Sequence, residues 1–505
     1  MGYSKQIKIG AILSYFSIAL NIVSGLIYTP WMISQIGESD YGLYTLANSL
    51  ITLFLVDFGL SSATSRYISK YRAEGRQDKI DSFLGAIYKL YLLIDAIIFV
   101  VLFVVFFCLS DIYVSLTFEE LERFKIVYVI VATFAIINFP CITLNGILNA
   151  YENFIQLKLA DVIYRVLLVT ITIVALVLGY GLFALVAIHS IVGLIVVLYK
   201  IIVIKKVTPI RINFKENDIL LYKDIFGFSI WITISSLAQR LVFNITPSIL
   251  GMLTNSMAIA VFGIVTTIEG YAYTITTAIN GMFMTRIARI YETNDSDIMP
   301  LFLKVGKFQY ALNGLILCGF VTVGKTFIKL WMGNDFLDAY YGILLVIIPG
   351  MFFNSLQIAN TAMVVKKKVK HQALVSIVTG VVNVVFSVVL TLQFGVLGAC
   401  MSIFIAYMFR AIAMHIVCWK VLKLNIVEFM KKCYLKMSIS ILLTICFGIV
   451  LNSFWLYESW FVLICKAFLI MIIYAILVFG VGLDKYDRSK IFKIIKNKIP
   501  SKEKK

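Results

Sequence analysis

Residues 182–204 read LFALVAIHSIVGLIVVLYKIIVI, an apolar run whose one Lys, Lys200, lies near its end. An α-helix rises 1.5 Å per residue, so about 20 apolar residues cross the roughly 30 Å hydrocarbon core of a bilayer. The sequence repeats such runs along its whole length. It therefore predicts an all-α polytopic membrane protein with about 14 transmembrane helices, near residues 9–33, 41–65, 84–108, 126–150, 159–180, 182–204, 226–250, 258–284, 303–324, 341–365, 372–393, 395–419, 437–455 and 460–483.

The composition of the 505 residues supports a lipid environment. Hydrophobic residues make up 61% of the chain and charged residues 14%, with a mean hydropathy of +0.94. Such a chain is too apolar for a water-soluble surface. The formal charge of +18 would suit nucleic-acid binding, but the basic residues lie in short clusters between apolar runs. Membrane lipids are therefore the expected partners of these clusters, and we expect no nucleic-acid partner.

The basic residues also predict an orientation. Most of the 45 Lys and Arg residues fall in alternate connections, including the amino terminus, residues 200–223 and the carboxyl terminus. Cytoplasmic connections carry the excess of Lys and Arg in membrane proteins. Both termini should therefore be cytoplasmic, and the number of spans should be even.

An internal repeat divides the predicted spans. Pro247 and Pro349 follow Pro30 and Pro140 at nearly one period, which suggests two six-helix lobes related by a pseudo-twofold axis. We expect these four prolines either to act as hinges for alternating access or to fit curved packing. The predicted division is 1–204 for the N-lobe, 205–224 for a cytoplasmic linker, 225–420 for the C-lobe, 421–483 for two added helices and 484–505 for a basic cytoplasmic tail.

Several short motifs in this frame are similar to a known family. They are Asp57-Phe-Gly-Leu-Ser-Ser-Ala63 leading to Arg66, Leu330-Trp-Met-Gly333, and glycine-rich turns before the sixth and twelfth spans. The chain resembles the polysaccharide-biosynthesis flippases of the multidrug/oligosaccharidyl-lipid/polysaccharide (MOP) exporter superfamily. The resemblance implies a MATE-like fold in a bacterial cytoplasmic membrane and transfer of an undecaprenyl-pyrophosphate-linked oligosaccharide to the outer leaflet. It also implies that polymerases and glycosyltransferases of the same pathway are partners.

Charged residues inside apolar spans are costly and usually face a cavity or a partner. Arg240 and Glu269 should lie at one depth in neighbouring spans, so we expect them to pair or to line the substrate cavity together. The resemblance places the cavity among the first, second, seventh and eighth spans. It adds these polar residues to the candidate cavity: Asn21, Asn48, Asp57, Gln239 and Asn244.

Other charges have simpler interpretations. Asp57 could equally serve in helix packing or at a cytoplasmic gate. Arg410 is a possible polar site in the twelfth span. Asp161 and Arg165 stand four residues apart, a spacing that predicts an ion pair within one helix.

The segment Gly319-Phe-Val-Thr-Val-Gly-Lys-Thr326 matches the P-loop pattern, but it ends an apolar span with no preceding strand. We therefore expect no nucleotide, cofactor or metal, and leave Na⁺ or H⁺ coupling through Asp57 or Glu269 open. Two alternatives remain at this point. One is a cation-coupled multidrug antiporter of the same fold, which would favour acidic cavity residues. The other, a membrane glycosyltransferase or polymerase, would need a long outer loop that the sequence does not offer.

Overall fold

The computed structural model describes residues 3–55, 57–214, 219–278, 283, 287, 290–291, 298–366, 368–455, 457–484 and 488–489. Every regular element in these ranges is a helix. Eleven helical stretches within them are long and apolar enough to cross a membrane. The fold is therefore that of an all-α multi-pass membrane protein, while the number of 14 spans stays a prediction.

The chain forms two compact units. The first contains residues 1–267 and 369–406, and the second contains residues 268–368 and 407–505. The lobe boundaries expected from the proline repeat stay a prediction.

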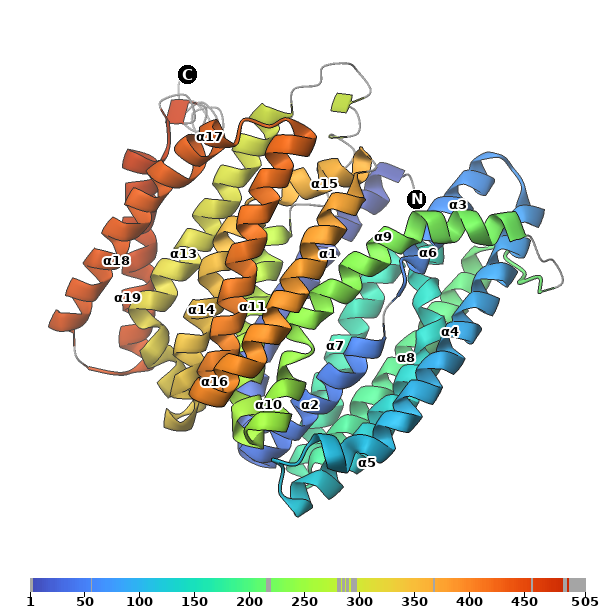
Figure 1. Cartoon of the computed structure of the whole chain (residues 1–505), viewed down its shortest axis with the longest axis horizontal. Helices are drawn as coiled ribbons and strands as arrows, with labels where there is room; N and C mark the ends of the chain where they lie inside the picture. Colours follow the sequence, from blue (N-terminus) through green and yellow to red (C-terminus); the bar gives the residue numbers. More distant parts are fainter. Residues whose placement is uncertain are drawn as a thin grey trace, which may run out of the picture. The chain divides into compact units, whose positions relative to one another are not determined.

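The first unit begins with eight α-helices interrupted by one short 3₁₀ turn, η1. Within it α1 packs on α7, α5 packs on α2, α4 and α8, and α3 packs on α4 and α6 (Figure 1). The bounds are α1 (Tyr3–Ile36), α2 (Glu38–Phe54), α3 (Leu60–Ala73), α4 (Gln77–Ile112), α5 (Phe118–Asn138), η1 (Phe139–Ile142), α6 (Thr143–Ala150), α7 (Phe154–Val177) and α8 (Leu182–Val207).

Three further helices complete this unit. They are α9 (Ile219–Phe243), α10 (Thr246–Leu253) and most of α11 (Ser256–Thr277). The unit also contains the first part of α16 (Val369–Leu422), which turns back at Gly395, where φ is 56° and ψ is −133°. Ser402 Oγ lies 3.1 Å from Asn383 Oδ1. A straight helix would separate these residues by about 28 Å, so the segments 369–394 and 396–406 of this unit fold back on each other at Gly395.

The second unit is built around α13, which packs on α14, α18 and α19 (Figure 1). It also contains the last parts of α11 and α16. The bounds of its other elements are α13 (Met299–Met332), η3 (Asn334–Phe336), α14 (Leu337–Asn354), α15 (Gln357–Val365), α17 (Ile426–Phe429), η4 (Met430–Leu435), α18 (Lys436–Phe454), α19 (Trp460–Leu477) and η5 (Val478–Gly482).

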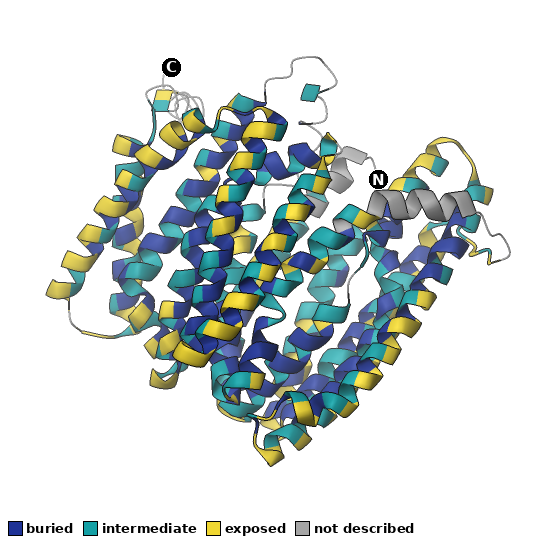
Figure 2. Cartoon of the chain, viewed as in Figure 1, coloured by how far each residue is buried: buried dark blue, intermediate teal, exposed yellow. Residues whose placement is uncertain are grey.

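The outer faces of these helices are apolar. Along α4, Leu93, Ile97, Val104 and Phe107 are each more than half exposed, while Phe83, Leu84 and Ile87 are fully buried. Figure 2 shows the same alternation of exposed and buried residues along the helix. A continuous exposed apolar stripe is unfavourable in water and suits a helix that faces lipid.

Candidate functional site

The second predicted span, residues 41–65, is not one helix. α2 ends at Phe54 and α3 begins at Leu60, with Phe58 and Gly59 at φ values of 50° and 67°. Left-handed residues cannot continue a right-handed helix, and the break frees backbone groups that need other partners. Asp57 lies inside this break.

Asp57 caps the start of α3. The backbone N–H of Ser61 donates to both carboxylate oxygens at 3.3 Å, and the Tyr91 hydroxyl of α4 donates to Oδ1 at 2.6 Å. A carboxylate at a helix amino terminus satisfies free N–H groups and is favoured by the helix dipole. The break therefore orients a negative charge inside an apolar region and ties it to α4.

A second break separates α9 from α10 just before Pro247. Asn383 donates to the carbonyls of Leu241 and Val242 at 3.1 and 3.2 Å, and Ser49 of α2 donates to the carbonyl of Asn244 at 2.8 Å. These bonds occupy carbonyls that the helix break would otherwise leave unpaired in an apolar environment. Side chains from other helices thus stabilise the interruption between α9 and α10.

Arg240 joins the two breaks. Its guanidinium donates to the carbonyl of Thr52 in the last turn of α2, and it interacts electrostatically with Asp57. The carboxyl end of a helix carries partial negative charge, so the end of α2 and the Asp57 carboxylate both attract the Arg240 guanidinium. The side chain is half-buried. We call Thr52, Asp57, Tyr91, Arg240 and Asn244 the helix-break junction.

The other predicted cavity residues have simpler surroundings. Asn48 donates to the carbonyl of Tyr44 one turn earlier at 2.9 Å, and Gln239 is exposed. Asn21 is exposed, and its carbonyl accepts from Arg165 Nη2 at 3.3 Å. The structure brings Asp57 and Arg240 together, Asn244 contacts α2 through its backbone carbonyl, and the role of the whole set as a substrate cavity stays a prediction.

The predicted ion pair between Asp161 and Arg165 is not formed, so this prediction is wrong. Asp161 pairs with Lys158 at 3.2 Å, and Arg165 Nε donates to Ser24 of α1 at 2.7 Å. Arg165 therefore links α7 to α1 instead of closing a pair within α7. A spacing of four residues permits a pair but does not decide between local and distant partners.

Arg410 and Glu269 belong to the second unit. Arg410 is 3% exposed, and its guanidinium lies 4.0 Å from the ring centre of Phe353 and 5.6 Å from that of Tyr407. The hydroxyls of Tyr273 and Tyr407 interact electrostatically with both Arg410 and Glu269. Because Arg240 lies in the first unit, its pairing with Glu269 stays a prediction.

The predicted hinge prolines differ in their surroundings. Pro30 and Pro349 lie inside the continuous helices α1 and α14. Pro140 lies in the 3₁₀ turn η1, and Pro247 stands at the start of α10. Two of the four therefore coincide with breaks, whereas hinge motion itself stays a prediction.

Sequence reasoning missed two residues. Tyr91 contacts Asp57, but a tyrosine in an apolar run gives no signal of such a bond. Asp95 of α4 is 9% exposed, and its Oδ1 has no hydrogen-bond partner among the described residues. An acid in the middle of an apolar run was the available signal for Asp95.

The P-loop-like segment 319–326 lies inside α13, so its backbone N–H groups belong to a helix rather than to a phosphate-binding loop. Within the described residues, no group of three or more His, Cys, Asp or Glu side chains could hold a metal ion.

Three solved structures of membrane transporters or flippases have a similar fold. The lipid II flippase MurJ in an inward closed conformation superposes with a TM-score of 0.69 at 14% identity, covering 95% of this chain and 98% of that protein. An inward-facing multidrug resistance MATE family transporter of the MOP superfamily gives a TM-score of 0.68 at 15% identity, with 83% and 99% covered. A MOP superfamily transporter from Pyrococcus furiosus gives 0.62 at 15% identity, with 83% and 97% covered. At these identities the likeness establishes the fold alone.

The sequence itself identifies the family. No match was found among curated proteins. The profile of the family described as "Polysaccharide biosynthesis protein" matches residues 10–289, more than half of the chain and the whole helix-break junction. The chain therefore belongs to the polysaccharide biosynthesis protein family, and its fold is similar to that of MATE transporters and MurJ.

Proposed function

We propose that this protein is a flippase that moves an undecaprenyl-pyrophosphate-linked oligosaccharide from the inner to the outer leaflet of a bacterial cytoplasmic membrane. The observation that carries the proposal is the position of Arg240 where two broken helices meet. Family membership supports a role in polysaccharide assembly, and the fold supports transport rather than catalysis.

The chemistry of the junction suits a pyrophosphate. An arginine presents planar, always charged donors that bind phosphate oxygens in pairs. The helix-end carbonyl of Thr52, which now accepts from Arg240, can be exchanged for phosphate oxygens as a ligand enters, and Asp57 acts on Arg240 only through its charge. Arg240 would then bind the headgroup while Asp57 keeps α3 capped.

A polar headgroup needs such a site because sugar hydroxyls lose their bonds to water in hydrocarbon, at several kcal/mol for each unsatisfied group. A hydrated path between two alternating states would remove this cost while the lipid tail stays in the bilayer. The helix breaks near Pro140 and Pro247 are the proposed flexible points.

The energy source follows from charge. An inside-negative potential favours outward movement of an anionic headgroup by about 2.3 kcal/mol per charge for each 100 mV. Entry of Na⁺ or H⁺ through Asp57 or Glu269 is a second proposed source. In this scheme both termini are cytoplasmic, and the product reaches a polysaccharide polymerase on the outer side.

A second candidate, a cation-coupled multidrug antiporter, is favoured by one observation. Asp95 is a buried carboxylate in an apolar helix, and one of its oxygens has no partner among the residues that the structure describes, as a cation-coupled carrier would need.

The test is a deletion strain. Cells that lack this chain should accumulate the lipid-linked oligosaccharide on the inner leaflet, measured by protection from an impermeant glycan-modifying enzyme in oriented vesicles. Wild-type protein should restore access to the enzyme. Normal surface polysaccharide in the deletion strain, together with increased sensitivity to cationic drugs, would reject the flippase and favour the antiporter.

A further inference from the structure

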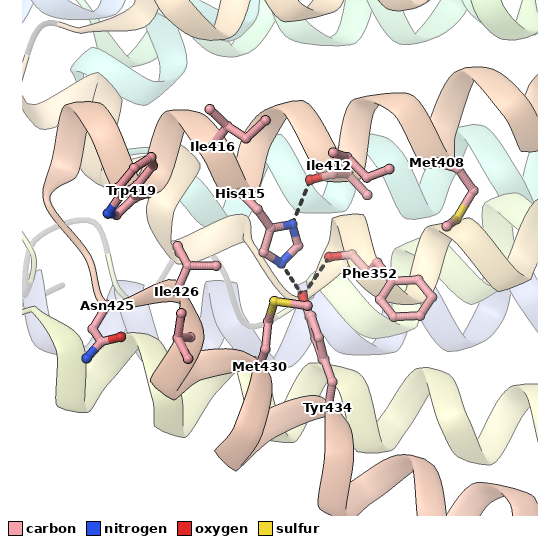
Figure 3. A pocket seen from close by; sticks show the side chains of 12 residues that line it. Phe352, Met408, Ile412, His415, Ile416, Trp419, Asn425, Ile426, Met430 and Tyr434 are labelled. Carbon is pink, nitrogen blue, oxygen red and sulfur yellow. Dashed lines mark hydrogen bonds between the residues drawn. The ribbon is translucent and has the colours of Figure 1, made fainter.

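A groove in the second unit plays no part in the proposed transport. It encloses about 570 Å³ between the second part of α16, the α17–η4 segment and the end of α14. Figure 3 shows Trp419 and Asn425 at one end and Met408 at the other, with His415 and Tyr434 between them.

The rim of the groove is apolar and exposed. Ile412, Ile416 and Trp419 follow one another at helical spacing along α16 and are 60%, 48% and 61% exposed. Val427 and Met430 form the opposite rim at 63% and 50% exposure. In a helix bundle surrounded by lipid, a groove with such a rim is open to acyl chains along its side.

The polar groups in the floor already have partners. One ring nitrogen of His415 lies 2.6 Å from the carbonyl of Ala411, and the other lies 2.9 Å from the Tyr434 hydroxyl. Tyr434 in turn lies 2.7 Å from Ser355 Oγ. A sugar or polar drug would find few hydrogen bonds to make here, whereas an apolar chain would cover the aromatic and aliphatic wall at no such loss.

One end of the groove carries positive charge. Lys420 and Lys423 are exposed and stand within two residues of Trp419 and Asn425, the lining residues at that end. The nearby acid, Glu428, pairs with Lys432 at 2.6 Å. Tryptophan and lysine together at the end of an apolar helix are typical of the headgroup level, where lysines attract anionic lipids.

We propose that this groove binds one acyl chain of an anionic glycerophospholipid whose headgroup lies against Lys420 and Lys423. The apolar rim and floor select the chain, and the lysines select the headgroup charge. The site is separate from the helix-break junction, and its occupancy does not depend on which substrate the protein moves.

The test uses the full chain in liposomes with photoreactive phosphatidylglycerol or phosphatidylcholine that carries a diazirine near the acyl end. Phosphatidylglycerol should label peptides within residues 408–430 more than phosphatidylcholine does, by about fivefold per effective lysine. The double substitution Lys420→Gln and Lys423→Gln should remove this preference but leave labelling by phosphatidylcholine unchanged.

A groove-filling variant separates binding from general contact with lipid. Ile416→Trp should lower the labelling of 408–430 by about fivefold or more, because the indole takes the volume of several methylenes. The matched control is Leu442→Trp on α18, an exposed apolar position outside the groove, which should leave the labelling unchanged.

Three results would overturn the proposal. One is equal labelling of Ile416→Trp and wild type. Another is equal labelling by both phospholipids. The third is displacement of the probe by undecaprenyl phosphate at lower concentration than by phosphatidylglycerol, which would make the groove a site for the tail of the transported lipid.

Discussion

Arg240 and Arg410 are the same side chain on two apolar helices, but their surroundings differ. Arg240 is half-buried, donates to a helix-end carbonyl and lies in the field of Asp57. Arg410 is 3% exposed and lies against the rings of Phe353 and Tyr407. Arg240 thus donates to a backbone carbonyl, whereas Arg410 lies against aromatic rings, and its neighbours Tyr273 and Tyr407 also interact with Glu269. We therefore propose that Arg240 serves a ligand and that Arg410 serves packing.

The largest stability effect should come from Arg410. Arg410→Ala removes a cation from two aromatic rings, and we expect a loss of about 2 kcal/mol, since desolvated cation–π contacts are worth that much. The melting temperature in detergent should fall by several degrees, while transport per folded molecule stays near the wild-type value. Unchanged melting together with lost transport would place Arg410 in the transport path and remove the contrast with Arg240.

A smaller effect should come from Asp57. Asp57→Asn keeps one oxygen for the Ser61 N–H but loses the charge that Tyr91 and Arg240 meet, so we expect about 1 kcal/mol of stability loss. Transport should also fall, because Arg240 is less well positioned. Asp161→Asn is the matched control, since its partly exposed pair with Lys158 should contribute little. Equal effects of both variants would show that Asp57 has no special role.

The smallest effect should come from the two ion pairs of Asp484, which follows the last apolar stretch. Hydrogen bonds from Lys307 and Lys436 lower the pKa of Asp484 to about 2. A lowered carboxyl pKa adds stability above its unfolded-state pKa, near pH 4, and that stability disappears as the pH falls towards 2. We expect a loss of about 0.5 kcal/mol across this window, because the carboxylate is partly exposed.

Asp484→Asn should make the melting temperature less dependent on pH between 4 and 2. An unchanged slope in this variant would mean that the two lysines do not stabilise the fold through Asp484. Asp484 and its two lysines serve as a reference for Arg240 and Arg410, because they are opposite charges that pair directly near the end of the last apolar helix.

Hydropathy predicted the helical membrane fold because each apolar run is long enough to cross a bilayer. It could not predict the break at Asp57, since the backbone there depends on partners from α4 and α9 that lie far away in the sequence. The proline repeat likewise could not predict which prolines lie at helix breaks. Pro247 marks a break because Asn383 and Ser49 satisfy the freed carbonyls, while Pro30 lies inside a continuous helix.

The most direct test of the central claim is the rate at which reconstituted vesicles translocate lipid-linked oligosaccharide, compared at equal folded protein for wild type, Arg240→Ala, Arg240→Lys and Arg410→Ala. A hydrogen bond to a charged group contributes about 1.5–3 kcal/mol, so Arg240→Ala should slow translocation by about 10- to 100-fold. Arg240→Lys should recover part of the rate, and Arg410→Ala should stay near wild type. A wild-type rate in Arg240→Ala would contradict a substrate role for the helix-break junction.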